Sequence, residues 1–110
     1  MRARAALAAA LEAGADVSVP AAVVAETVRG AATDAPVNRV LKAIGEIDVA
    51  NEGIGRTAGR LLGTAGSAAT IDAIVVATAI ETGGAVILTG DAGDLGAVAV
   101  GSPCVIIEPL

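Results

Sequence analysis

Residues 70–91 read TIDAIVVATAIETGGAVILTGD, and this stretch decides the fold. It predicts a helix over 71–81, with Thr70 as its N-cap and a glycine pair to end it. The apolar run Ala85–Thr89 then has the near-continuous hydrophobicity of a strand covered on both faces. Asp91 follows and can cap another helix. A helix that leads directly into a buried strand is typical of parallel α/β domains.

Helices and strands alternate through the rest of the chain as well. Apolar spacing and Gly or Pro boundaries predict further helices over 3–13, 21–29, 36–44 and 54–62, with Asp34 as the cap of the third. Short strands are predicted over 16–19, 46–49 and 105–107. We therefore expect a single domain, residues 1–110, with a three-layer α/β/α architecture around a parallel sheet.

The composition excludes several kinds of functional site. The chain has 110 residues, 55% of them hydrophobic, with no aromatic residue, no His, one Cys and a formal net charge of −5. Without His there is no Ser-His triad and no His zinc site, and one Cys excludes both an internal disulfide and a Cys-cluster metal site. Cys104 lies in an apolar run and is expected to be a buried, inert thiol. An acidic chain does not bind nucleic acid by phosphate neutralisation alone.

No segment is typical of a membrane span or a secretory signal. The most apolar segment, residues 71–88, contains Asp72, Glu81 and a glycine pair, and Glu12 interrupts the Ala-rich N-terminal run. We expect a cytoplasmic protein with no membrane partner.

Acidic residues follow the predicted strands. Asp91 comes after the strand Ala85–Thr89, with Asp94 one turn later; Glu26 lies in the helix after strand 16–19, and Asp72 lies in the first turn of helix 71–81. Each suits a helix cap, a helix dipole or a solvated helix face. Ligands bind beyond the carboxyl ends of parallel strands, and carboxylates gathered there repel each other unless a cation lies between them. Oxygen ligands without His or Cys suit Mg²⁺ or Mn²⁺.

The chain resembles a known family at these same positions. Three motifs, in order and at the right spacing, look like the successive acidic motifs of PIN-domain proteins, and most of all like those of VapC-like toxins from bacterial toxin–antitoxin pairs. The motifs are Val19-Pro20-Ala21 to Glu26-Thr27-Val28-Arg29-Gly30, Ile71-Asp72-Ala73 to Ala77-Thr78-Ala79, and Ile87-Leu88-Thr89-Gly90-Asp91 with Asp94-Leu95.

The resemblance implies a metal-dependent endoribonuclease. By it, Glu26, Asp72 and Asp91 are Mg²⁺ ligands and catalytic residues, Asp94 is an accessory carboxylate, and Thr89 lies beside the metal. The family also implies an RNA substrate, a homodimer and a cognate antitoxin that occludes the site.

The resemblance also implies a central first strand that ends in a metal-binding Asp. No such segment precedes Ala3, and Asp16 begins the next predicted strand rather than ending the first. We therefore expect a sheet without its central strand, a metal site short of one carboxylate, and impaired activity.

Arg29, Arg56 and Arg60 could guide an RNA backbone, although a solvated helix surface explains them equally. Two other functions stay open. One is a non-catalytic PIN-like module that binds an antitoxin or associates with itself. The other is a phosphoacceptor domain, which needs a Lys beside its acidic cluster, whereas the only Lys, Lys42, lies in the helix predicted over 36–44.

Overall fold

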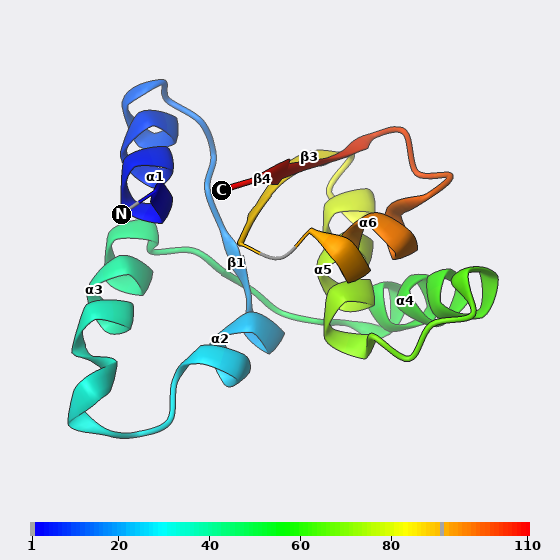
Figure 1. Ribbon diagram of the computed structural model, residues 1–110, viewed down its shortest axis with the longest axis horizontal. Helices are drawn as coiled ribbons and strands as arrows, with labels where there is room; N and C mark the ends of the chain where they lie inside the picture. The colour runs from blue at the N-terminus through cyan, green and yellow to red at the C-terminus, as the bar shows by residue number, and fades with distance from the viewer. Residues whose placement is uncertain (1, 91) are drawn as a thin grey trace. The chain divides into compact units, whose positions relative to one another are not determined.

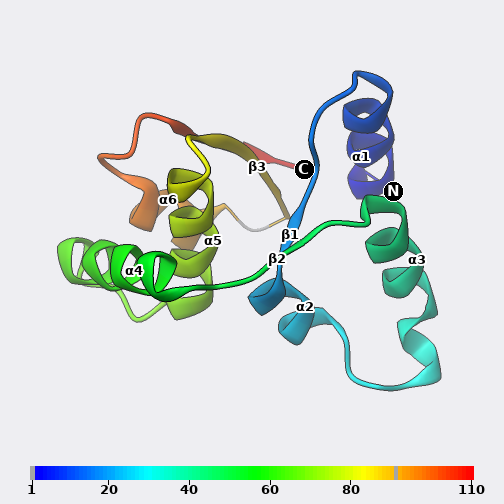
Figure 2. The same ribbon diagram turned by 180° about the vertical axis from the view of Figure 1, so that it is seen from behind.

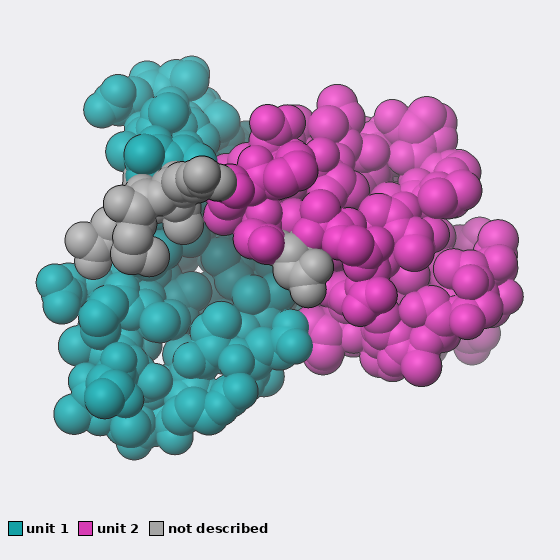
Figure 3. Space-filling model, viewed as in Figure 1, with its two compact units in different colours: residues 1–49 teal, residues 50–110 magenta. Residues whose placement is uncertain are grey.

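The computed structural model describes residues 2–90 and 92–110, and it divides the chain into two compact units, residues 1–49 and 50–110 (Figure 3). The first unit contains α1 (Arg2–Glu12), β1 (Val19–Pro20), α2 (Ala21–Thr27), the 3₁₀ helix η1 (Ala32–Asp34), α3 (Ala35–Ile44) and β2 (Ile47–Asp48) (Figure 1). The second contains α4 (Glu52–Ala65), α5 (Thr70–Glu81), β3 (Ala85–Thr89), α6 (Gly93–Ala99) and β4 (Val105–Pro109).

The first unit is built on one short pair of parallel strands. Val19 of β1 lies opposite Ile47 of β2, and the N–H of Val19 donates 3.1 Å to the carbonyl of Glu46. Among residues 5–49, for which burial is described, Asp34 alone is buried. The helices of this unit therefore contribute half-buried rather than fully buried apolar side chains.

The second unit holds the hydrophobic core. Strands β3 and β4 pair in parallel over five residue pairs, from Ala85 opposite Val105 to Thr89 opposite Pro109. One face of this sheet packs on α5 and α6, where Val76, Leu95, Val98 and Val105 are buried. Because successive strand residues alternate between faces, the other face exposes Val86, Leu88 and Ile106, at 57, 42 and 56%. We call these three residues the outer face.

Small residues bring α4 and α5 together. Ala58 in α4 and Ala73 and Ala77 in α5 are at most 4% exposed and form one cluster with Ile54. The two helices lie side by side in both ribbon views (Figures 1 and 2). Alanine side chains at a helix contact allow a close approach of the two backbones, so a core without aromatic residues can still be well packed.

The predicted fold class is confirmed: helices alternate with parallel strands. The strands form two separate two-stranded sheets, β1 with β2 and β3 with β4, and within the second unit β3 is covered on one face instead of both. Helix α4 is longer than predicted because the Asn51 side chain caps its start, accepting 3.0 Å from the N–H of Ile54, and because it continues to Ala65, with Gly66 as its C-cap.

Three local predictions are wrong. Thr70 is the first residue of α5 and not its cap, because Ala69 occupies that position. The Asp34 side chain does not cap α3; it bonds to backbone that precedes η1. Cys104 is exposed and not buried, because it lies in the turn before β4. The cap predicted at Asp91 lies outside the described residues.

Candidate functional site

Several of the expected site residues lie on elements that adjoin the carboxyl end of β3. Thr89 is the last residue of β3, and Asp94 lies in the first turn of α6, the next helix. Helix α5 leads into β3 through a tight turn at Gly83 and Gly84, so its first turn, which contains Asp72, lies toward the opposite end of the helix from that turn. This β3–α6–β4 crossover is the arrangement in which open parallel sheets bind ligands beyond their strand ends.

Asp72 and Asp94 differ in their surroundings. Asp72 is half-buried beside Ala73, which has no exposed surface, whereas Asp94 is exposed beside the buried Leu95. Both lie at the positive end of a helix, which favours an anionic side chain. Thr89 is held at the end of its strand because its carbonyl accepts 2.8 Å from the N–H of Leu110.

The structure does not show the other two expected ligands, Glu26 and Asp91, beside Asp72 and Asp94. Glu26 is exposed in α2 of the first unit. Asp91 lies outside the described residues. Among residues 2–90 and 92–110, no three acidic or Cys side chains are close enough together to hold a metal ion.

The donor chemistry of the expected ligands nevertheless fits a hard divalent cation. Asp72 and Asp94 offer carboxylate oxygens, and the chain has no His. The one thiol, Cys104, precedes β4 and so lies toward the amino end of that strand, away from its carboxyl end. Oxygen ligands alone suit Mg²⁺ or Mn²⁺ rather than Zn²⁺.

The three expected RNA-backbone arginines have protein partners. Arg29 donates 2.8 Å from Nη1 to the carbonyl of Ala25, at the C-terminal end of α2. Arg56 forms an exposed ion pair of 2.8 Å with Glu52, one turn earlier in α4. Arg60 donates 3.1 Å from Nη2 to the hydroxyl of Thr57. Arg56 and Arg60 thus make different contacts although they share a helix.

Sequence reasoning missed the role of Asp34. Its Oδ2 accepts three backbone hydrogen bonds, 3.0 Å from Ala31, 2.9 Å from Arg29 and 2.7 Å from Gly30. The bonds from Ala31 and Arg29 hold the pKa of Asp34 below its ordinary value, against the opposing effect of burial. The Asp34 carboxylate therefore has a structural role: it fixes the backbone of the loop between α2 and η1.

Comparison with known proteins identifies the fold family. The PIN domain family matches residues 1–100 of the chain. PIN domains are typically nucleases and usually bind divalent metals. No similar curated protein and no similar solved structure was found. In the described part of the chain, no helix has the length and apolar character needed to cross a membrane.

Proposed function

Because the chain belongs to the PIN domain family, we propose that it is a metal-dependent endoribonuclease of the VapC-like toxin type. The observation that carries the proposal is the position of Asp72, Thr89 and Asp94 on the elements that flank the carboxyl end of β3. That edge is where an α/β sheet binds its ligands.

In this proposal Glu26, Asp72 and Asp91 hold the metal and Asp94 assists. A bound Mg²⁺ or Mn²⁺ would lower the pKa of a water and would offset the charge of the scissile phosphate. Asp72 lies in the first turn of α5, where the positive end of the helix suits an acidic side chain. Thr89, at the end of β3, offers a hydroxyl that can orient a phosphate oxygen or a water.

The charge of the chain limits how RNA is bound. With a net charge of −5, the protein repels a phosphate backbone except where cations gather. We propose that the bound metal and the arginines Arg29, Arg56 and Arg60 supply that local attraction. As in the family it resembles, the protein would act in the cytoplasm as a homodimer, and a cognate antitoxin would cover the site.

The test is metal-dependent stabilisation followed by RNA cleavage. Mn²⁺ at about 100 times its Kd should stabilise the folded protein by about 2.7 kcal/mol, measured as a rise in Tm. Asp72→Asn and Asp91→Asn should abolish this rise and also cleavage of a labelled RNA. Asp16→Asn, which removes an exposed carboxylate of the first unit, should change neither. An unchanged Tm of the unmutated protein with Mn²⁺ would overturn the metal site.

A second candidate function is a non-catalytic PIN-like module that binds an antitoxin or a second copy. The observation in its favour is the apolar outer face of Val86, Leu88 and Ile106, each more than 40% exposed. Exposed apolar surface of this kind marks association sites. Tight binding of a partner together with RNA cleavage no faster than that of Asp72→Asn would favour this function over the first.

A further inference from the structure

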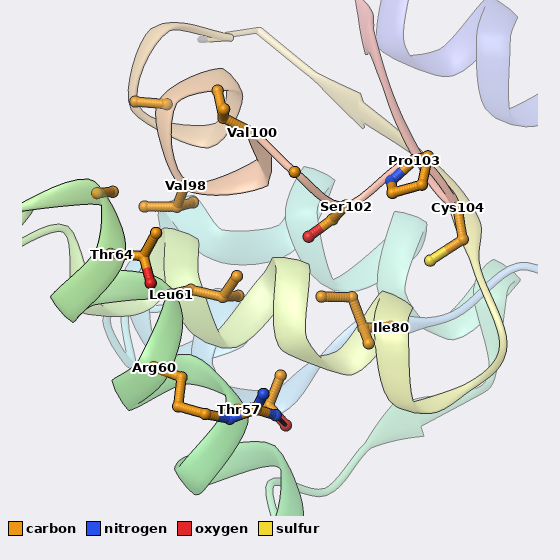
Figure 4. Close-up of a pocket in the computed structure, with 13 residues that line it drawn as sticks. Thr57, Arg60, Leu61, Thr64, Ile80, Val98, Val100, Ser102, Pro103 and Cys104 are labelled. Atoms are coloured by element: carbon orange, nitrogen blue, oxygen red, sulfur yellow. Dashed lines mark hydrogen bonds between the residues drawn. The ribbon is translucent and has the colours of Figure 1, made fainter.

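The second unit contains an open groove between α4, the C-terminal half of α5 and the loop that joins α6 to β4. Its volume is about 680 Å³, within the usual range of small-molecule sites. Figure 4 shows that Leu61, Ile80 and Val98 line it from α4, α5 and α6, and that Ser102 and Cys104 line it from the connecting loop.

One end of the groove carries a positive charge. Arg60 lines it, and one of its five N–H donors is used by Thr57. Thr57 in turn donates 2.7 Å to Glu81, so the buried hydroxyl lies between the guanidinium and the carboxylate and bonds to both. Within the described residues no carboxylate oxygen lies within 4.0 Å of the Arg60 nitrogens. The guanidinium therefore has donors left for an anion.

The rest of the groove is aliphatic. Leu61, Ile80, Val98 and Val100 line it, and the chain has no aromatic residue anywhere. A nucleobase is usually held by stacking on an aromatic ring, so these walls are poorly suited to a base. Saturated hydrocarbon, by contrast, is bound by contact with aliphatic side chains without any directional partner.

We propose that this groove binds a small anionic amphiphile, a carboxylate with a saturated chain, whose carboxylate pairs with Arg60 and whose chain lies over Leu61, Ile80 and Val98. A carboxylate matches the planar fork of a guanidinium and forms charge-assisted hydrogen bonds with it. The exposed Val100, at 76%, gives the far end of the chain an apolar surface at the rim.

The groove is separate from the proposed metal site. Ile80 lies in the last turn of α5 and Asp72 in its first, which puts them about 12 Å apart along the helix axis. Ligand binding in the groove is therefore measured at residues distant from the metal site, and in the absence of RNA.

Cys104 provides a specific readout, because it is the only Cys of the chain, is exposed, and lines the groove. The rate of its alkylation by iodoacetamide should fall saturably as decanoate is added below its micellar concentration. Decanol and decylamine, with the same chain length but no negative charge, should protect Cys104 at least about ten-fold less well, as expected for the loss of one ionic hydrogen bond.

Arg60→Gln should raise the half-saturating decanoate concentration about ten-fold and leave that of decanol unchanged. Arg56→Gln is the matched control, since Arg56 lies one turn away on α4, does not line the groove, and is 77% exposed. Val100→Asp, at an exposed rim position, should weaken the protection of Cys104 by decanoate and should not weaken its protection by decylamine. Equal protection by the three amphiphiles, an unchanged decanoate response in Arg60→Gln, or no protection at all would overturn the proposal.

Discussion

The hydroxyl of Thr57 in α4 donates a hydrogen bond of 2.7 Å to Oε1 of Glu81 in the last turn of α5. Thr57 is only 4% exposed, and its oxygen also accepts 3.1 Å from Arg60. One buried hydroxyl thus bonds to both an acid and a base, at a helix contact that is otherwise formed by apolar side chains. A buried polar group in this position contributes stability because both of its hydrogen-bonding roles are filled.

Thr57→Val keeps the shape of the side chain and removes both bonds. We expect the free energy of unfolding to fall by about 1 kcal/mol in urea denaturation, because Glu81 loses its donor. Thr64→Val is the control: it lies in the same helix with the same cost in helix propensity, but it is exposed. A loss of the same size in both variants would show that the Thr57 bonds contribute nothing.

The lowered pKa of Asp34 predicts that the stability of the fold depends on pH. Its pKa is lowered in the folded protein by the backbone N–H donors, chiefly that of Ala31, so its contribution to stability is complete above the ordinary Asp pKa of about 3.9. It is lost as the pH falls through the folded pKa, since protonation weakens the acceptor. Tm measured between about pH 5 and pH 3 should therefore fall more steeply for the unmutated protein than for Asp34→Asn. Asp16→Asn should keep the steep slope.

Gly84 is the most constrained glycine of the turn before β3. Its φ is +113°, and an added Cβ would lie 2.7 Å from the carbonyl oxygen of Cys104. Gly84→Ala should lower the free energy of unfolding by about 1–3 kcal/mol, measured by thermal denaturation. Gly63→Ala, inside α4 with no atom within 4 Å of the new methyl, should raise it by about 0.5–1 kcal/mol. Equal effects would contradict the close approach at Gly84.

The clearest sequence signals gave the most accurate elements. The glycine pair sets the end of α5, which was predicted one residue short at its start, and the apolar run after the pair sets β3, which was predicted at its observed bounds. These signals lie within one short stretch of sequence, so both elements can be predicted without knowledge of the tertiary fold. Strands β1 and β2 have two residues each and were predicted too long, because two-residue pairings leave almost no periodicity to read.

The candidate site was predictable in part. The positions of Asp72 and Asp94 in the first turns of their helices follow from the strand and helix boundaries. Glu26 belongs to the other compact unit, and its place in the metal site stays a prediction, as does that of Asp91. The use of Asp34 depends on the path of residues 29–31, and the exposure of Cys104 depends on the turn that precedes β4. Neither is encoded in a short periodic pattern.

The two faces of the β3–β4 sheet give a matched pair of substitutions. Val76 of α5, packed under the inner face, has no exposed surface, whereas Val86 on the outer face is 57% exposed. Val76→Ala removes buried methyl groups and leaves a cavity, so we expect the free energy of unfolding to fall by about 2 kcal/mol. Val86→Ala should cost less than about 0.5 kcal/mol in dilute solution.

Repeating the Val86→Ala measurement over a range of protein concentrations tests whether the outer face joins two copies of the chain. If copies of the chain associate through the outer face, the unmutated protein gains stability with concentration by mass action, and Val86→Ala gains less. A difference between the two proteins that grows with concentration would therefore support self-association. A constant difference below about 0.5 kcal/mol would show that this face carries no contact between copies, which removes the observation in favour of the self-associating module.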